Sequence, residues 1–299
     1  MRVFVTGAGG WVGSAVVEEL LGEGHDVIGL VRSESSAALL ESTGATALRG
    51  DLDDLDSLRR GAEVADAVIH LANKHDWANP AATNLTERTA VQTLGDVLAG
   101  SGRAFLAASA VASIVASGAA IEDDASPAVG LNSMRGGSEN LALSFAAQGV
   151  RAMVVRLAPS VHGRGDNRGF VGGLVRAARA AGMSGFIDDG TNTWSAVHRS
   201  DAAALIRLGI ENASAGTRLH AIAEESITTR AIAEAIASKY GLVTASIPAT
   251  DALTHFGPVG RFFALDIRAN SLQTRDRLNW SPHAPTLSDD IAAGAYDAA

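Results

Sequence analysis

The stretch Thr6-Gly7-Ala8-Gly9-Gly10-Trp11-Val12-Gly13 decides the fold, because it joins a predicted strand at Val3–Val5 to a predicted helix at Val12–Leu21. Gly7 permits a tight turn, Gly10 lets a pyrophosphate approach the backbone, and Gly13 lets helix and strand pack closely. The helix N-terminus adds free N–H groups and a positive dipole end. We therefore predict a dinucleotide-binding turn made by Gly7, Gly10, Trp11, Val12 and Gly13; a purely structural glycine turn is the alternative.

Short β-branched runs alternate with Ala/Leu-rich stretches through the first half of the chain. The runs that predict strands are Val3–Val5, Val27–Val31, Ala45–Leu48, Ala67–Leu71, Ala104–Ala107 and Ala152–Leu157. The stretches that predict helices are Val12–Leu21, Ser35–Glu41, Ser57–Gly61, Leu85–Ala99 and Ser138–Gln148. Strands separated by helices imply right-handed crossovers and a parallel sheet covered on both faces. The expected fold is α/β, a Rossmann-type doubly wound sheet.

A smaller C-terminal substrate lobe is expected after about residue 160, where turn-rich segments interrupt this alternation. Further helices are expected near 168–182, 199–211, 229–240 and 286–295. We assign 1–162, with 198–224 interleaved, to the dinucleotide-binding domain, and 163–197 with 225–299 to the lobe. Ligands of such folds bind at the carboxyl edge of the sheet, so the lobe should close over that edge.

Composition narrows the class of protein further. The 299 residues include 24 Lys+Arg and 33 Asp+Glu, which gives a formal charge of −9. Nucleic-acid binding needs clustered cations, so we expect no nucleic acid as a partner. Cysteine is absent, which excludes disulfides and thiolate metal sites, and the histidines lack metal-ligand spacing, so no metal is expected. The sequence shows neither an apolar run of roughly 18 residues nor a signal-peptide layout. We expect no membrane association and a cytoplasmic location.

The TGxxGxxG spacing of Thr6–Gly13 resembles the short-chain dehydrogenase/reductase superfamily, in particular its extended, epimerase-like branch. Further matches follow in the family's order over nearly the whole chain: Gly50-Asp51-Leu52, His70-Leu71-Ala72, Arg156-Leu157-Ala158-Pro159, Val197-His198-Arg199-Ser200-Asp201 and Leu278-Asn279-Trp280-Ser281-Pro282. The resemblance implies that Asp51 and Leu52 contact adenine, that Leu71 and Ala72 lie beside the cofactor, and that Pro159 lies near the nicotinamide.

The end of the second predicted strand indicates which nicotinamide cofactor is bound. A carboxylate there binds the ribose 2′-hydroxyl of NAD, whereas an Arg accommodates the 2′-phosphate of NADP. The strand ends at Arg32-Ser33, about 20 residues after the glycine turn, as the fingerprint requires. Arg32 and Ser33 favour NADP, with NAD as the alternative, although Glu34 would oppose the phosphate if it pointed inward.

The family's catalytic pattern is broken in this chain. The superfamily uses a Tyr proton donor, a Lys four residues later, and a Ser or Thr. The only tyrosines are Tyr240 and Tyr296, and neither has a Lys at that spacing. Aligning Glu139 with the Glu seven residues after the family's Tyr places Asn132 at the Tyr position and Gly136 at the Lys position. Compared with the family's FxxSSS-type ending of the fifth strand, the stretch Phe105–Ala110 places Ala110 at the Ser position, with Ser109 one residue before it.

Ser109, His75, Asn132 and Arg135 remain as candidate catalytic residues. Asn132 and Arg135 should begin the helix that carries the family's Tyr, and Arg135 could supply the cationic field that Lys gives elsewhere. Ordinary polar loop, strand-capping and surface roles are the alternatives for these side chains. 

We expect an NADP-dependent oxidoreductase that reduces a small carbonyl-type substrate without the YxxxK pair. A non-catalytic NADP-binding redox sensor or scaffold is the main alternative, and an epimerase or dehydratase is less favoured because it also relies on Tyr and Lys. The expected partners are a small-molecule substrate and, as an open option, a second copy of the chain in a homodimer.

Overall fold

A seven-stranded parallel sheet forms the centre of the computed structural model, which describes residues 1–76, 78–114 and 118–299. Its strand order is β10-β6-β5-β4-β1-β2-β3, so the chain reverses direction across the sheet between β1 and β4. The strands are β1 (Arg2–Thr6), β2 (Asp26–Val31), β3 (Thr46–Arg49), β4 (Ala67–His70), β5 (Ala104–Ala110), β6 (Arg151–Leu157) and β10 (Arg218–Ala221). The carboxyl ends of β1 and β4 therefore meet at the switch point where such sheets bind ligands.

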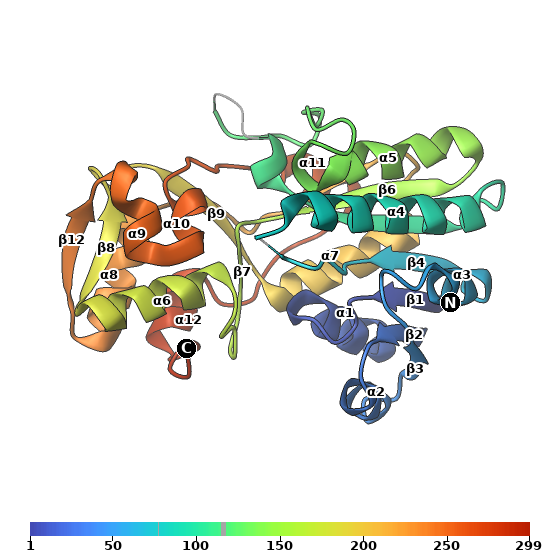
Figure 1. Cartoon of the computed structure of the whole chain (residues 1–299), viewed down its shortest axis with the longest axis horizontal. Helices are drawn as coiled ribbons and strands as arrows, with labels where there is room; N and C mark the ends of the chain where they lie inside the picture. The colour runs from blue at the N-terminus through green and yellow to red at the C-terminus, as the bar shows by residue number, and fades with distance from the viewer. Residues whose placement is uncertain (77, 115–117) are drawn as a thin grey trace.

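Helices cover both faces of this sheet (Figure 1). Helices α1 (Trp11–Gly22) and α7 (Arg199–Asn212) pack together on one face. The other face carries α3 (Leu55–Glu63), α4 (Pro80–Leu98) and α5 (Ser138–Ser144), and α2 (Glu34–Glu41) flanks β3. Alternate strand residues fill two separate cores, because Val3 and Val5 face one layer of helices and Phe4 faces the other. The predicted doubly wound α/β fold is thus confirmed.

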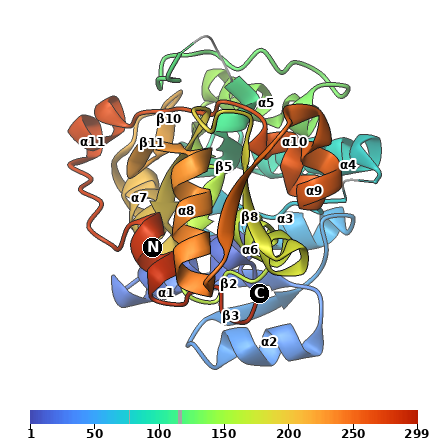
Figure 2. The same cartoon turned by 90° about the vertical axis from the view of Figure 1, so that its left-hand side faces the viewer.

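The second lobe lies beyond the carboxyl edge and has two small sheets of its own. One contains β7 (Ser160–His162), β9 (Thr193–His198) and β11 (Glu224–Thr228), and the other pairs β8 (Met183–Ile187) with β12 (Val243–Ile247). Figure 2 views this lobe end-on, with α8 in front of the strands. Its helices are α6 (Phe170–Ala181), α8 (Thr229–Tyr240), α9 (Ala252–Phe256), α10 (Gly260–Phe263) and α12 (Leu287–Ala292). Helix α11 (Leu272–Leu278) instead packs against α7, beside the edge strand β10 of the main sheet.

Several element bounds differ from those expected. A seventh strand, β10, joins the main sheet after α7, and β7 pairs with β9 rather than with the main sheet. Helix α4 begins at Pro80, five positions before Leu85, because Pro at the first helical turn sacrifices no hydrogen bond. The expectation that Asn132 and Arg135 begin a helix is wrong. Residues 135–137 all have positive φ, so the α-helical conformation starts only at Ser138.

Within the described residues, no helix is both long and apolar enough to cross a bilayer.

Candidate functional site

The glycine turn between β1 and α1 has the geometry that a pyrophosphate requires. Gly7 has φ of 75°, and a Cβ there would lie 2.8 Å from the Ala72 backbone nitrogen. A Cβ on Gly13 would lie 2.0 Å from the Gly7 carbonyl oxygen, so the turn cannot close on α1 with a larger residue. These two contacts explain why glycine is needed at both positions.

The N-terminus of α1 is open to an anion. Gly10 is the N-cap, no side chain caps the helix, and its first turn holds no acidic residue. The N–H groups of Trp11, Val12 and Gly13 belong to the first turn, where a helix supplies no carbonyl partner. A dinucleotide pyrophosphate fits these donors and this end of the helix dipole. The residues present therefore fit the predicted cofactor.

Trp11 ties this turn to the second lobe. Its Nε1 donates to the Val161 carbonyl of β7 at 2.7 Å, and the Arg199 guanidinium lies 4.3 Å from the centre of the Trp11 ring. Trp11 and Val12 are both half-buried. The first helical turn at the phosphate site is thus held against a strand of the neighbouring sheet.

The end of β2 carries the two residues on which the sequence prediction of NADP depends. Arg32 is exposed, and Ser33 caps α2 by accepting a hydrogen bond from the Ser36 backbone N–H at 3.1 Å. The Glu34 carboxylate forms an ion pair with Arg49, which also donates to the Arg32 carbonyl at 2.9 Å. Pairing with Arg49 offsets the charge by which Glu34 would oppose a phosphate beside Arg32.

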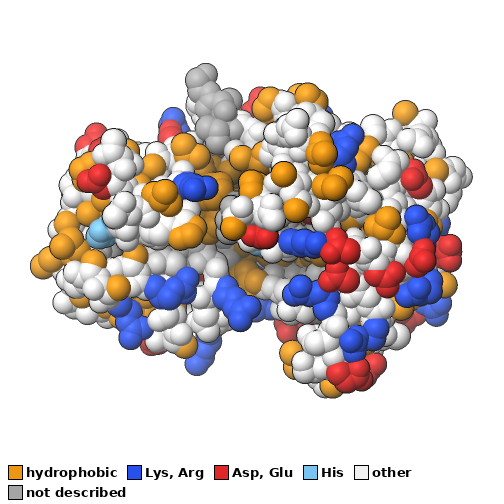
Figure 3. All heavy atoms as spheres, in the orientation of Figure 1, with side chains coloured by type: hydrophobic (Ala, Val, Ile, Leu, Met, Phe, Trp, Pro, Cys, Tyr) orange, Lys and Arg blue, Asp and Glu red, His pale blue; other side chains and the backbone are white. Residues whose placement is uncertain are grey.

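The other predicted cofactor residues line the same edge of the sheet. Asp51 follows β3 and accepts from the Asp53 N–H at 2.9 Å, while Leu52 is buried in the core beneath. Leu71 and Ala72 follow β4 and are half-buried, as is Pro159, which lies between β6 and β7. Figure 3 shows the surface hollowed between the two lobes, beyond this edge.

A buried polar cluster begins one residue before the glycine turn. Thr6 Oγ1 lies 2.8 Å from His70 Nδ1 and also accepts from the Ala72 N–H at 3.3 Å. His70 has 0% of its side chain exposed, and burial is the main reason that its pKa lies below the ordinary value. His70 is consequently neutral at physiological pH.

Glu87 of α4 joins that cluster to Arg135. Its carboxylate accepts from Arg135 Nη2 at 2.6 Å and from Asn73 Nδ2 at 2.9 Å, and Oε1 lies 3.9 Å from His70 Nε2. Only 1% of the Glu87 side chain is exposed, against 20% for Arg135. Burial acts to raise the pKa of Glu87, but the charge of Arg135 and the hydrogen bonds from Arg135 and Asn73 outweigh it and lower the pKa.

Sequence reasoning missed Glu87, although a signal was present. Glu87 precedes Ala90, Val91 and Leu94 at helical spacing, so it lies on the apolar, buried face of α4 rather than on its solvent face. A carboxylate on such a face needs a charged partner. Looking for that partner would have singled out the residue.

The candidate catalytic residues fall into different surroundings. Arg135 joins the Glu87 cluster. His75, with φ of 49°, donates its backbone N–H to Asn73 Oδ1 at 2.8 Å. Desolvation, followed by the charge of Arg135, lowers the pKa of His75. Asn132 is exposed in the turn that precedes Arg135.

Ser109 belongs to a second buried network. Ser109 is 2% exposed, and its hydroxyl donates to Glu139 Oε2 at 2.6 Å. Glu139 is paired with Arg156 at 2.6 Å, and Arg156 also donates to His220 Nε2 at 3.2 Å. The Ser109 hydroxyl of β5 thus donates to Glu139, which also pairs with Arg156 of β6. This arrangement favours a structural role for Ser109, in which it helps to hold β5 against β6.

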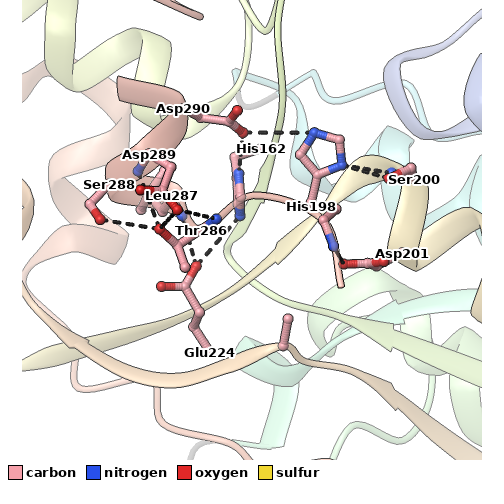
Figure 4. A network of polar contacts seen from close by, with 12 residues as sticks. His162, His198, Ser200, Asp201, Glu224, Thr286, Leu287, Ser288, Asp289 and Asp290 are labelled. Carbon is pink, nitrogen blue, oxygen red and sulfur yellow. Dashed lines mark hydrogen bonds and ion pairs between the residues drawn. The ribbon is translucent and has the colours of Figure 1, made fainter. Parts of the chain in front are cut away.

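A third network lies within the second lobe and reaches the start of α7 (Figure 4). His162 Nδ1 donates to Asp290 at 2.6 Å, and its Nε2 lies 3.6 Å from Glu224. His198 packs edge-on against His162 and accepts from the Ser200 N–H at 3.2 Å. Both histidines therefore hold β7, β9, β11 and α12 together. In the part of the chain that the structure describes, no group of three His, Asp or Glu side chains could hold a metal ion.

A parallel sheet with a glycine turn at its switch point and a lobe beyond its carboxyl edge defines a dinucleotide-binding protein of the Rossmann type. The family model for the NAD dependent epimerase/dehydratase family matches residues 3–222. The chain belongs to that family, within the extended short-chain dehydrogenase/reductase superfamily, as its motifs predicted. Members of this superfamily are NAD(P)-dependent oxidoreductases, epimerases and dehydratases.

Relatives span the whole chain. An uncharacterized protein of Schizosaccharomyces pombe is 40% identical, with 99% of this chain and 100% of the relative covered. The sterol-4-alpha-carboxylate 3-dehydrogenase (decarboxylating) of Dictyostelium discoideum is 27% identical over 97% of this chain and 94% of its own length. The dTDP-glucose 4,6-dehydratase DesIV of Streptomyces venezuelae, solved with NAD, superposes with a TM-score of 0.78 at 19% identity, covering 99% of this chain and 96% of that one. This last likeness concerns the fold alone.

Proposed function

We propose that the protein is an NADP-dependent reductase of small carbonyl compounds. The observation that carries the proposal is the juxtaposition of the glycine turn with the Thr6–His70–Glu87–Arg135 cluster, joined through the Ala72 N–H to Thr6 hydrogen bond of 3.3 Å. A dinucleotide that starts at the turn and runs along the carboxyl edge brings its nicotinamide toward this cluster. Arg32 and Ser33 support NADP over NAD.

Arg135 takes the role of the missing Tyr and Lys in this proposal. When bound, NADPH supplies a hydride to the carbonyl carbon, and the carbonyl oxygen then takes a proton from water. Negative charge builds on that oxygen before protonation, and a guanidinium fixed nearby lowers the barrier. Glu87 holds Arg135 in place. His70 is neutral, so Arg135 is the cation of this cluster that stabilises the developing negative charge. His75 is the candidate for orienting the water.

A non-catalytic NADP-binding sensor is the second candidate, and Ser109 favours it. In a reductase that followed the family's pattern, a hydroxyl at the end of β5 would face the substrate, whereas Ser109 donates to buried Glu139. The proposed reductase therefore depends on Arg135 and not on Ser109.

Steady-state oxidation of NADPH with a panel of aldehydes, ketones and imines tests the proposal. We expect turnover with NADPH above that with NADH, and a loss of roughly a hundredfold or more in kcat for Arg135→Met. Ser109→Ala is the matched comparison, because its position in a separate network predicts a much smaller loss. Turnover that survives in Arg135→Met and disappears in Ser109→Ala would contradict the assignment, and NADPH binding without turnover would favour the sensor.

A further inference from the structure

The cluster around Arg135 contains two buried nitrogen atoms whose hydrogen-bonding capacity is unused. Among the described residues, neither Nε of Arg135 nor Nε2 of His70 has a hydrogen-bond partner. Both side chains flank the same Glu87 oxygen, Arg135 at 2.6 Å and His70 at 3.9 Å. Buried polar atoms are almost always satisfied, and the exceptions call for a ligand or an ordered water. The Arg135 side chain is 20% exposed and the His70 side chain 0%, so Arg135 forms the solvent-facing side of the cluster.

The formal charges at this position cancel. Arg135 is a cation, Glu87 is held ionised against it, and His70 is neutral because burial lowers its pKa. Lys74, which follows the Glu87 partner Asn73 in the chain, forms a second balanced pair with Asp53 at 2.6 Å. A ligand atom beside Arg135 Nε and His70 Nε2 therefore finds hydrogen-bond donors at a place where the formal charges of the surrounding side chains sum to zero.

We propose that Glu87 is a specificity-determining residue that restricts the site to carbonyl compounds that are uncharged near the reacting group, and that excludes carboxylates such as 2-oxo acids. A carbonyl oxygen carries only a partial charge in the ground state, so it accepts from Arg135 without repulsion from Glu87. A carboxylate brings a full negative charge next to the Glu87 carboxylate. Charge that develops only during reduction is met by donors already in place, which is differential stabilisation of the transition state.

This inference rests on the proposed reductase but is tested by binding, without turnover. The probes are isobutyramide, which has a carbonyl oxygen and no charge, and isobutyrate, which has nearly the same shape and one negative charge. Each is titrated into the NADPH-loaded protein by calorimetry. We expect the unmodified protein to bind isobutyramide, and to bind isobutyrate more weakly by roughly tenfold or more, the usual effect of a like charge at this range.

Glu87→Gln should remove most or all of the preference. It preserves the size of the side chain and leaves Arg135 unbalanced, so isobutyrate should bind about tenfold more tightly than to the unmodified protein. Isobutyramide affinity should change by no more than about threefold, because Arg135 still donates to the neutral oxygen. Glu63→Gln removes an exposed carboxylate of α3 and should leave both affinities unchanged. An unchanged ratio in Glu87→Gln, or an unmodified protein that prefers isobutyrate or binds neither probe, would overturn the inference.

Glu87→Gln/Arg135→Met covers the case in which the single variant does not fold, since it leaves no unpaired buried charge. Isobutyrate should stay excluded, and isobutyramide should lose about tenfold in affinity because its donor is gone. Unchanged isobutyramide binding in this double variant would place the carbonyl site elsewhere. If the binding preferences follow expectation but no carbonyl compound oxidises NADPH, the reductase proposal fails while the assignment of Glu87 stands.

Discussion

Arg135 has a backbone conformation that residues other than glycine rarely adopt. Its φ of 52° costs on the order of 1 kcal/mol in local strain. Gly136 and Gly137 follow with φ of 62° and 66°, and a Cβ on Gly136 would lie 2.5 Å from the Asn84 carbonyl oxygen. This geometry disfavours a Lys at position 136, where the resemblance placed the family's Lys. Strain of this kind is typical of functional sites.

Cofactor preference is a property of single residues at the end of β2. Replacing Arg32 with Asp removes a charge-assisted contact to the 2′-phosphate and adds repulsion. We expect the preference for NADPH over NADH to fall by about 1.5–3 kcal/mol or more. Calorimetric titration of both cofactors measures this, and Arg59→Asp, an exposed change on α3, serves as the control. Equal affinities for both cofactors in the unmodified protein would show that Arg32 does not read the phosphate.

Gly10→Val should abolish cofactor binding while the fold is retained. A Cβ at Gly10 already lies 3.0 Å from the Gly7 carbonyl oxygen, and the branched side chain would occupy the pyrophosphate space. Gly9→Ala is the matched control, because a Cβ at Gly9 meets nothing within 4 Å. Thermal unfolding with and without NADPH reports the result. If NADPH still stabilises Gly10→Val, the pyrophosphate lies elsewhere.

At the scale of elements, the start of α6 holds a carboxylate in an unfavourable state. Asp166 accepts from the Gly169 N–H at 2.7 Å but is only 3% exposed, and burial raises its pKa to about 6. A carboxyl whose pKa is raised on folding binds its proton more tightly when folded. Its contribution to stability is therefore greatest at low pH and falls as the pH rises through about 6.

Asp166→Asn should accordingly stabilise the protein near neutral pH. The amide oxygen can still accept from Gly169, and no buried charge remains. We expect a gain of up to about 3 kcal/mol in the free energy of unfolding at about pH 8, and little or none at about pH 4. Urea denaturation at both pH values measures it, with the exposed Asp276→Asn as the control. A gain independent of pH would mean that the carboxyl titrates normally.

At the scale of the whole molecule, a polar network holds the second lobe together beside its junction with α7, and His162 is the central group. Burial alone would lower the pKa of His162, but the hydrogen bonds and charges of Asp290 and Glu224 outweigh it and raise the pKa. A raised histidine pKa gives stability that is fully present at low pH and is lost as the pH rises through the folded value. His198 and Asp166 also face this group, so the contribution is best isolated by a difference between variants.

Asp290→Asn should destabilise the protein by about 1.5–3 kcal/mol at about pH 6, because it replaces a charged hydrogen-bond partner with a neutral one. The difference should be smaller at about pH 9 than at about pH 6, because a rising pH favours loss of the His162 proton in both proteins. Denaturant unfolding at the two pH values measures this. A destabilisation that grows with pH would contradict a protonated His162 at the junction.

The sequence predicted the doubly wound sheet and the glycine turn well, because both follow from local periodicity and from backbone demands at Gly7, Gly10 and Gly13. It predicted the chemistry of the site poorly. The contact of Glu87 with Arg135 joins residues 48 positions apart, and the φ of Arg135 depends on packing against α4. Ser109 lies one residue before the position of the family's Ser, and its proton is directed to Glu139, which only the folded chain places beside it.

Hydride transfer itself is the central claim, and isotopic labelling tests it most directly. The NADPH complex of the unmodified protein, carrying deuterium at the transferable position of the nicotinamide, is mixed with an uncharged ketone in a single turnover. We predict that mass spectrometry finds the deuterium on the former carbonyl carbon of the alcohol product, and that Arg135→Met slows its appearance by roughly a hundredfold or more. NADPH that is consumed with no deuterium in the product, or is not consumed with any carbonyl compound, would contradict the account.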